Sequence, residues 1–291
     1  MRAREPDQQG FVSRNGVRIG YEVFGEGPDT VLFLPTWSIV PSRVWKAQVP
    51  YLARHLRVVT FDGRGSGRSD RPTESAAYEP REFSADALAV LDAAGVAEAW
   101  VVSFSRGSTW AVVLAAEHPE RVRGTVFIAP SIALAPGHKR EIDFNKLHAD
   151  PANLEGWQRY NRHSWVADYR GFLEFFFNEM FTEPHSSKQI EDCIGWGLET
   201  TPEILIATDE ARGLPGAELR ELCARLRCPS LVIHGDADAI MPVGRGAALA
   251  EATRGRLVTL EGAGHAPPAR DPVKVNLLLR DFVAPRPPAR R

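Results

Sequence analysis

One serine of this sequence lies in a setting where its hydroxyl could act as a nucleophile. Residues 103–107 read SFSRG; they overlap the end of an apolar run at 100–104, and a helix-favouring segment follows from residue 108. A strand, a sharp turn and a helix in this order hold the central residue, Ser105, in strained backbone geometry with its hydroxyl exposed. Ser103 and Gly107, two positions away, are small enough for such a turn. The pattern alone also fits an ordinary turn serine ahead of a helix.

A serine needs a base to become nucleophilic, and the base needs an acid that orients it. The acid could come from residues 231–242, which read LVIHGDADAIMP, an apolar strand followed by an acidic loop. The base could come from residues 261–268, EGAGHAPP, where glycines flank His265. From the residues alone, Asp236 and Asp238 are both candidates for the acid.

The same acidic loop has a second interpretation. His234, Asp236 and Asp238 alternate, so in an extended chain they share one face and could be metal ligands. These residues would supply ligands on only one side of a metal ion, and no other His/Asp cluster in the sequence completes the coordination sphere. We therefore expect no metal and no organic cofactor.

Together these motifs resemble those of the α/β-hydrolase family. Residues 103–107 match its G-x-S-x-G motif with serine in place of the first glycine, and H-G-x-x-D-x-x-x-P and G-x-G-H are its usual settings for acid and base. The resemblance covers roughly residues 31–283 and is weak in the middle. It implies that Ser105 is the nucleophile, Asp238 the acid and His265 the base. Asp236 remains an alternative acid. Other family members place the acid after the strand that here is 125–129, but the loop that follows it, PSIALAP, holds no carboxylate.

The resemblance also implies where an oxyanion would be bound. It points to the backbone N–H groups of Trp37 and Arg106, two donors that would stabilise developing charge. Pro35-Thr36 stands where the family usually has His-Gly, so this loop departs from the family pattern. The Trp37 ring could line the acyl pocket or pack in the core. The Arg106 side chain could bind a substrate carboxylate or pair with a carboxylate of the protein.

The elements that must position these residues alternate regularly. An Asn-Gly turn at residues 15 and 16 predicts a hairpin over residues 11–24. Continuous apolar runs predict buried strands at 30–34, 57–61, 100–104, 125–129, 230–233 and 257–260. Amphipathic or Ala/Leu-rich segments predict helices at 45–55, 84–95, 108–118, 218–226, 246–253 and 273–283. This order predicts an α/β fold: a mainly parallel twisted sheet flanked by helices, as in the α/β-hydrolase fold.

The alternation stops between residues 133 and 217. That segment has no buried strand, is rich in aromatic residues and is too long for a plain loop. We expect a core at 1–132, a helical cap at 133–217 and a second part of the core at 218–291. The core would end in a disordered, basic, Pro-rich tail. Within the cap, GFLEFFFNEMF at 171–181 could pack on itself or roof an apolar acyl pocket, with Phe172 and Phe176 as candidate substrate contacts.

Composition narrows the possible partners and location. The 35 basic and 37 acidic residues give a formal charge of −2 without a basic patch, so we expect no nucleic-acid binding. No window reaches 18 apolar residues and the N-terminus lacks an apolar signal, so we expect no membrane segment and no signal peptide. Three cysteines without a C-x-x-C pair favour a reducing cytoplasm. The sequence leaves the oligomeric state open.

The resemblance implies a capped serine hydrolase that transfers an acyl group from a small-molecule substrate to water, with a carboxylic ester as the default substrate. Thioesters, lactones, carbon–carbon diketones and peracids are handled by the same residues. The alternative from a different class is a non-catalytic or regulatory ligand-binding module with the same fold.

Overall fold

The computed structural model describes residues 4–284; the predicted disordered tail lies outside the described residues. Eight strands form one sheet in the order β1-β2-β4-β3-β5-β6-β7-β8. The strands are β1 (Gln8–Arg14), β2 (Val17–Phe24), β3 (Thr30–Phe33), β4 (Arg57–Phe61), β5 (Ala99–Phe104), β6 (Val122–Ile128), β7 (Ser230–Gly235) and β8 (Arg256–Leu260). The β1–β2 and β2–β4 pairs are antiparallel and all others are parallel, which confirms the predicted α/β fold.

Helices cover both faces of this sheet. They are α1 (Val49–Leu52), α2 (Pro80–Ala93), α3 (Gly107–Glu117), α8 (Gly216–Arg225), α9 (Val243–Ala252), α10 (Pro267–Arg270) and α11 (Pro272–Val283). Residues of α2, α3, α8 and α9 share one apolar cluster with Val101 of β5, whereas residues of α1 and α11 share the other with Val102. Successive strand residues point to opposite faces, so both faces of the central parallel strands are buried. The predicted buried strand at 257–260 forms, as β8, but it lies at the edge of the sheet and only its Leu260 is buried.

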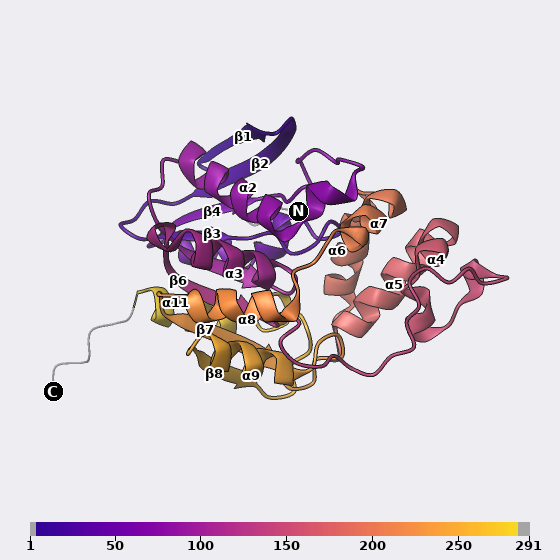
Figure 1. Ribbon diagram of the computed structural model, residues 1–291. Coiled ribbons are helices and arrows are strands. Elements are labelled where there is room, and N and C mark those ends of the chain that lie inside the picture. The colour runs from indigo at the N-terminus through magenta and orange to yellow at the C-terminus, as the bar shows by residue number, and fades with distance from the viewer. Residues whose placement is uncertain (1–3, 285–291) are drawn as a thin grey trace.

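Between β6 and β7, the described residues form helices and loops without a strand. Before α8, which packs on the sheet, the α-helices of this segment are α4 (Arg162–Ala167), α5 (Tyr169–Met180), α6 (Ser187–Gly197) and α7 (Pro202–Glu210). Figure 1 shows them grouped at one end of the molecule, beyond the sheet. The parallel strands all run in one direction, so their carboxyl ends meet at a single edge, where ligands of such folds bind.

Two predicted helices differ from those observed. The predicted helix at 45–55 is a 3₁₀ turn at Ser42–Trp45 followed by the single turn α1. Pro50 explains this, because proline has no N–H for the carbonyl four residues earlier and tolerates only the first helical turn. The helix predicted at 84–95 begins earlier, with Pro80 in its first turn.

No helix within residues 4–284 is long and apolar enough to cross a membrane. The three cysteines are all unpaired: Cys193 and Cys223 are buried, and Cys228 is partly buried.

Candidate active site

Ser105 lies in a strained turn between β5 and α3. Its φ of 51° is in the left-handed region, which residues with a side chain rarely adopt. The backbone around it is held firmly: its N–H donates to Ile128 O at 3.0 Å, and its carbonyl accepts the Ser131 N–H at 3.1 Å. Ser105 is half-buried, so its hydroxyl can be reached from outside.

Close contacts explain why the residues two positions before and after Ser105 are small. A Cβ on Gly107 would lie 2.4 Å from Pro35 O, so only glycine lets the loop after β3 approach this turn. Ser103 is fully buried, and its hydroxyl donates to Val126 O at 3.1 Å. Serine is therefore accommodated where the family motif has glycine.

Three predicted residues form one hydrogen-bonded chain. The Ser105 hydroxyl lies 2.9 Å from His265 Nε2, and His265 Nδ1 lies 2.8 Å from Asp238 Oδ2. A carboxylate only accepts, so Nδ1 carries the proton and Nε2 is free to accept the serine proton. His265 and Asp238 are 2% and 4% exposed, which removes bulk water from the pair. The three side chains come from the ends of β5, β7 and β8, so the parallel sheet brings together residues 160 positions apart.

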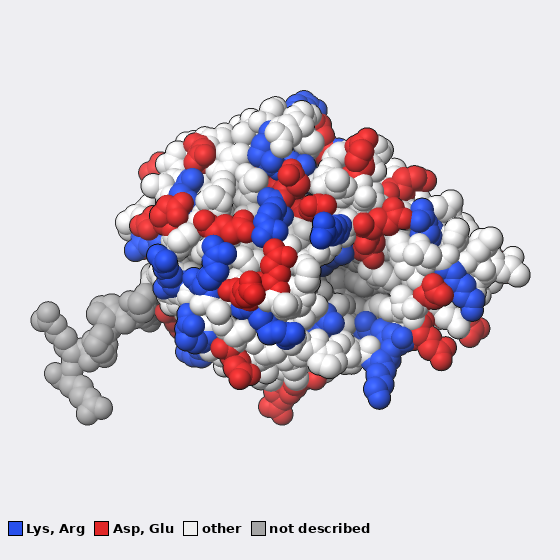
Figure 2. All heavy atoms as spheres, in the orientation of Figure 1, with Lys and Arg blue, Asp and Glu red and all other residues white. Residues whose placement is uncertain are grey.

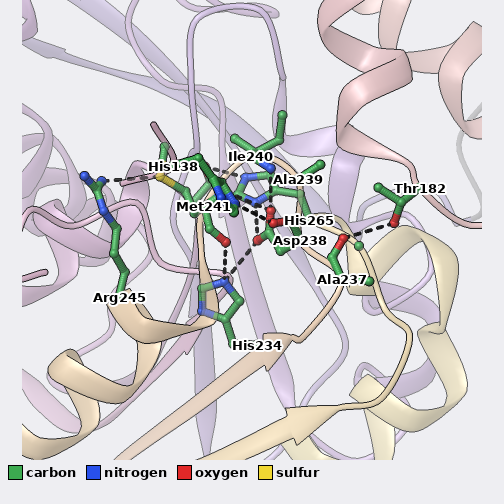
Figure 3. A network of polar contacts seen from close by, with 12 residues as sticks. His138, Thr182, His234, Ala237, Asp238, Ala239, Ile240, Met241, Arg245 and His265 are labelled. Atoms are coloured by element: carbon green, nitrogen blue, oxygen red, sulfur yellow. Dashed lines mark hydrogen bonds and ion pairs between the residues drawn. The ribbon is translucent and has the colours of Figure 1, made fainter. Parts of the chain in front are cut away.

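Asp238 accepts hydrogen bonds on both carboxylate oxygens. Oδ1 accepts the backbone N–H groups of Ile240 and Met241, each at 2.8 Å, and Oδ2 also lies 3.0 Å from His234 Nε2 (Figure 3). Burial alone would raise the pKa of Asp238. The charge of His265 and the hydrogen bonds from His234, His265 and Met241 outweigh burial and hold that pKa well below its usual range. Asp238 is therefore ionised at neutral pH.

His234 contacts the acid directly, a role that the sequence did not reveal. Its Nε2 lies 3.1 Å from Met241 O as well as 3.0 Å from Asp238 Oδ2, and both oxygens only accept. Nε2 therefore carries the proton and is shared between them. The ring is fully buried, and a Cβ on Gly246 would lie 2.5 Å from its Nδ1, so no bulkier residue fits on that side.

Asp236 points elsewhere. Its side chain is exposed, and Oδ1 accepts the Gly262 N–H at 2.7 Å, which fixes the turn after β8. No three His, Cys, Asp or Glu side chains within residues 4–284 converge in a way that could hold a metal ion. The alternation of His234, Asp236 and Asp238 thus serves two separate hydrogen-bonding tasks.

The two N–H groups expected to bind an oxyanion lie in adjoining backbone. The loop holding Trp37 packs against the nucleophile turn through the close approach of Pro35 O to Gly107. The Arg106 N–H has no acceptor in the part of the chain that the structure describes, whereas Trp37 forms an isolated antiparallel bridge with Val40, whose N–H donates to Trp37 O at 3.0 Å. An N–H group without a protein acceptor next to Ser105 is what an oxyanion site requires. The contribution of the Trp37 N–H stays a prediction.

The Arg106 side chain pairs with a carboxylate of the protein, the second of the two interpretations above. It forms an ion pair with Asp209 of α7, and its guanidinium lies 5.2 Å from the centre of the Trp37 ring. The Tyr160 hydroxyl donates to the other Asp209 oxygen at 2.6 Å. Burial, together with the charge of Asp209, raises the pKa of Tyr160, so the phenol stays protonated. These contacts join Arg106, the residue after Ser105, to the helical segment.

The predicted cap contacts lie in a cluster of rings. Phe176 of α5 packs edge-on against Trp37, with ring centres 5.2 Å apart, and is 7% exposed. Phe172 is 1% exposed and packs on Trp165 and Tyr160. Phe176 thus reaches the loop beside Ser105, whereas Phe172 lies inside the helical segment; substrate contact by either residue stays a prediction.

The segment between β6 and β7 also binds the loops that carry Asp238 and His265, and Figure 3 labels two of its residues, His138 and Thr182. His138 Nε2 donates to Asp238 O at 2.9 Å, and Arg140 donates to the carbonyls of Ala239 and Ile240. Glu183 Oε1 accepts the Gly264 N–H at 2.8 Å, one residue before His265. No local sequence pattern signals these contacts, because they depend on how distant segments pack.

Comparison with known proteins agrees with this geometry. Residues 29–271 match the family described as alpha/beta hydrolase fold. The chain is 29% identical, over 91% of its length and 99% of the relative, to a pimeloyl-[acyl-carrier protein] methyl ester esterase of Aeromonas hydrophila. It is 27% identical to a 2-hydroxymuconate semialdehyde hydrolase of a Pseudomonas species, over 82% of this chain and 81% of the relative.

Solved structures share the fold. The enol-lactonase from Burkholderia xenovorans superposes with a TM-score of 0.75 at 21% identity, covering 94% of this chain and 99% of that one. With a family match over most of its length, this chain belongs to the alpha/beta hydrolase fold family.

Proposed function

We propose that the protein hydrolyses carboxylic esters through an acyl-enzyme formed on Ser105. The observation that carries the proposal is the hydrogen-bonded chain from Ser105 Oγ through His265 to Asp238. This arrangement activates a hydroxyl for attack on a carbonyl carbon. Membership of a family whose relatives include a methyl ester esterase supports an ester as the substrate.

In the first step, Ser105 Oγ forms a bond to the ester carbonyl carbon while its proton passes to His265 Nε2. The carbonyl π pair moves to oxygen, and the N–H groups of Trp37 and Arg106 hold the resulting oxyanion. Each such donor is worth about 3 kcal/mol in a site that excludes water. The oxyanion then collapses, the ester C–O bond breaks, and the alcohol leaves with the proton from His265.

In the second step, water attacks the acyl-enzyme. His265 Nε2 accepts a proton from the water as its oxygen bonds to the carbonyl carbon, and returns that proton to Ser105 Oγ when the acid leaves. Asp238 remains ionised throughout and stabilises the imidazolium that forms twice in the cycle. Its low pKa suits this task, because a protonated Asp238 could not accept the Nδ1 hydrogen bond.

We further propose that residues 133–217 act as a cap, as their placement beyond the sheet edge supports (Figure 1). Helix α8 begins at Gly216, so its first residues lie within the predicted cap segment. A cavity of about 100 Å³ opens between α6 and the core, lined by Phe104 and Ala266, the neighbours of the nucleophile and the base. Most other lining side chains are apolar, including Met180 and Phe181, which favours an apolar portion of the substrate there.

Hydrolysis of 4-nitrophenyl esters of increasing acyl chain length tests this function. An acyl-enzyme predicts a burst of nitrophenol approaching one equivalent per protein chain when deacylation is slower than acylation, and steady turnover in every case. The background rate of hydrolysis is measured with Ser105→Ala, which removes only the hydroxyl group. Hydrolysis no faster than this background, across all chain lengths, would contradict the proposal and favour a ligand-binding module.

A further inference from the structure

A second cavity, of about 270 Å³, lies on the other side of the nucleophile turn. Its walls come from α2, α3, the connection between α7 and α8, and the loops after β3 and β6. On the face seen in Figure 2, the surface is hollowed between the core and the helices α4–α7, with basic side chains near the rim. Phe83 and Trp110 form an aromatic wall, with stacked rings 3.7 Å apart.

The cavity adjoins both halves of the proposed catalytic machinery. Arg106 and Trp37, the two proposed oxyanion donors, line it, as does Ser131, whose N–H binds the Ser105 carbonyl. Arg245 lines it from α9 and contacts Met241 Sδ at 3.3 Å, in the loop whose N–H groups bind Asp238. Ser105 itself does not line the cavity, but the next residue, Arg106, does, so the cavity lies close to the proposed nucleophile.

The charged side chains that line the cavity, within residues 4–284, are all arginines: Arg106, Arg212 and Arg245. Arg106 is neutralised by Asp209. Arg245 has no carboxylate partner in the described part of the chain, and its Nε–H binds only Ala135 O, at 3.2 Å. Arg212, on the exposed connection after α7, likewise has no ion pair there. Burial lowers the pKa of Arg245 with no carboxylate to offset it, yet a guanidinium remains charged in proteins.

A partly buried guanidinium without a counter-ion can form charge-assisted hydrogen bonds to an anion that enters the cavity. A cavity of about 270 Å³ has room for a small organic group, and its aromatic wall favours a carbon skeleton over a bare inorganic ion. We propose that the ester substrate carries a second, free carboxylate that binds Arg245, with Arg212 closing over it. This substrate class rests on the proposed function, and the anion site itself does not require catalysis.

Binding and turnover are tested separately. Monomethyl succinate, glutarate and adipate are compared with the same esters in which a carboxamide replaces the free carboxylate, so size is matched and only charge differs. Binding is measured by calorimetry on Ser105→Ala, which cannot turn the esters over. At least one monoester is expected to bind ten or more times more tightly than its carboxamide, and to lose that preference in 0.5 M salt.

Variants of the arginines show which side chain produces the preference for the free carboxylate. Arg245→Met should reduce the preference for the carboxylate at least tenfold, in binding and in kcat/KM, and Arg212→Gln about threefold. Arg245→Lys should restore part of it, because the charge returns without the bidentate geometry. Arg220→Gln is the matched control, an exposed arginine on α8 outside the cavity lining, and should leave the preference unchanged.

Equal binding of acid and carboxamide would overturn the inference, as would a preference that survives in the Arg212→Gln/Arg245→Met double variant. Tight, arginine-dependent binding without turnover would instead contradict the proposed function and leave the anion site standing.

Discussion

The loops at the sheet edge and the helical segment α4–α7 are held in different ways. At the sheet edge, backbone groups fix the proposed catalytic residues: Ser105 through Ile128 and Ser131, and Asp238 through two N–H groups of its own loop. The helical segment contacts these loops through side chains, such as the ion pair from Asp209 to Arg106, and through a backbone hydrogen bond from His265 N–H to Met180 O of α5 at 3.2 Å. The backbone of Ser105 and the carboxylate of Asp238 are thus held within the core, whereas His265 and Arg106 are also bonded to the helical segment.

The largest effect should follow a change at the sheet edge that leaves the backbone intact. Ser105→Ala removes only the hydroxyl, so we expect ester hydrolysis to fall by several orders of magnitude while the thermal unfolding temperature stays within a few degrees. Ser108→Ala is the control, since that buried hydroxyl has no hydrogen-bond partner in the described chain and does not face His265. Residual turnover within tenfold of the parent would exclude Ser105 as the nucleophile.

We expect substitutions of the two aspartates in the loop after β7 to differ clearly in their effect on kcat. Asp238→Asn should lower kcat by about 10³- to 10⁴-fold, because an amide can hold the wrong tautomer of His265. Asp236→Asn should cost less than tenfold, since Asp236 only accepts the Gly262 N–H. Steady-state kinetics on one ester suffices, and a dead Asp236 variant beside a nearly normal Asp238 variant would reverse the assignment.

His234 should have an intermediate effect. His234→Phe keeps a ring of similar size and removes the Nε2–H donor to Asp238, so a hydrogen bond to a charged group is lost. Such bonds contribute about 1.5–3 kcal/mol, and we expect kcat/KM to fall by about 10- to 100-fold. His234→Gln, which can present an N–H to the same oxygen, should recover part of the loss. Equal losses in both variants would indicate a packing role.

The same variant should change stability in acid. The pKa of Asp238 in the folded protein lies below the unfolded value of about 3.9. Ionisation of Asp238 therefore stabilises the fold above that pH, and the contribution disappears as the pH falls toward the folded pKa. Removing the His234 donor raises the folded pKa, so the midpoint of acid unfolding should move to higher pH in His234→Phe. An unchanged midpoint would contradict this electrostatic role.

The smallest effect on chemistry should come from the helical segment. Asp209→Asn leaves Arg106 without its counter-charge, and we expect a several-fold rise in KM with a smaller change in kcat, because the backbone donors stay in place. Tyr160→Phe removes only the hydrogen bond to Asp209 and should change KM less than twofold. A thousandfold loss of kcat in Asp209→Asn would show that the two regions are not separable.

The difference between the loops of the core and the helical segment also explains which parts of the site could be predicted from the sequence. Ser105, Asp238 and His265 each lie in a short motif a few residues after a predicted strand, so the local patterns and the parallel sheet together predict that the three residues meet. The role of His234 could not be predicted, because its motif fits a metal ligand as well as a donor to Asp238. The contacts of Asp209 and Arg140 have no local signal, and arise only when segments about 100 residues apart pack together.

The central claim, an activated serine at position 105, is tested most directly by a fluorophosphonate probe. Such a reagent phosphonylates a serine only where a base accepts its proton and donors hold the oxyanion. Peptide mass spectrometry of the labelled protein should place one modification on Ser105, and His265→Ala should slow that labelling at least a hundredfold. No labelling of Ser105, or labelling at an unchanged rate without His265, would contradict the account.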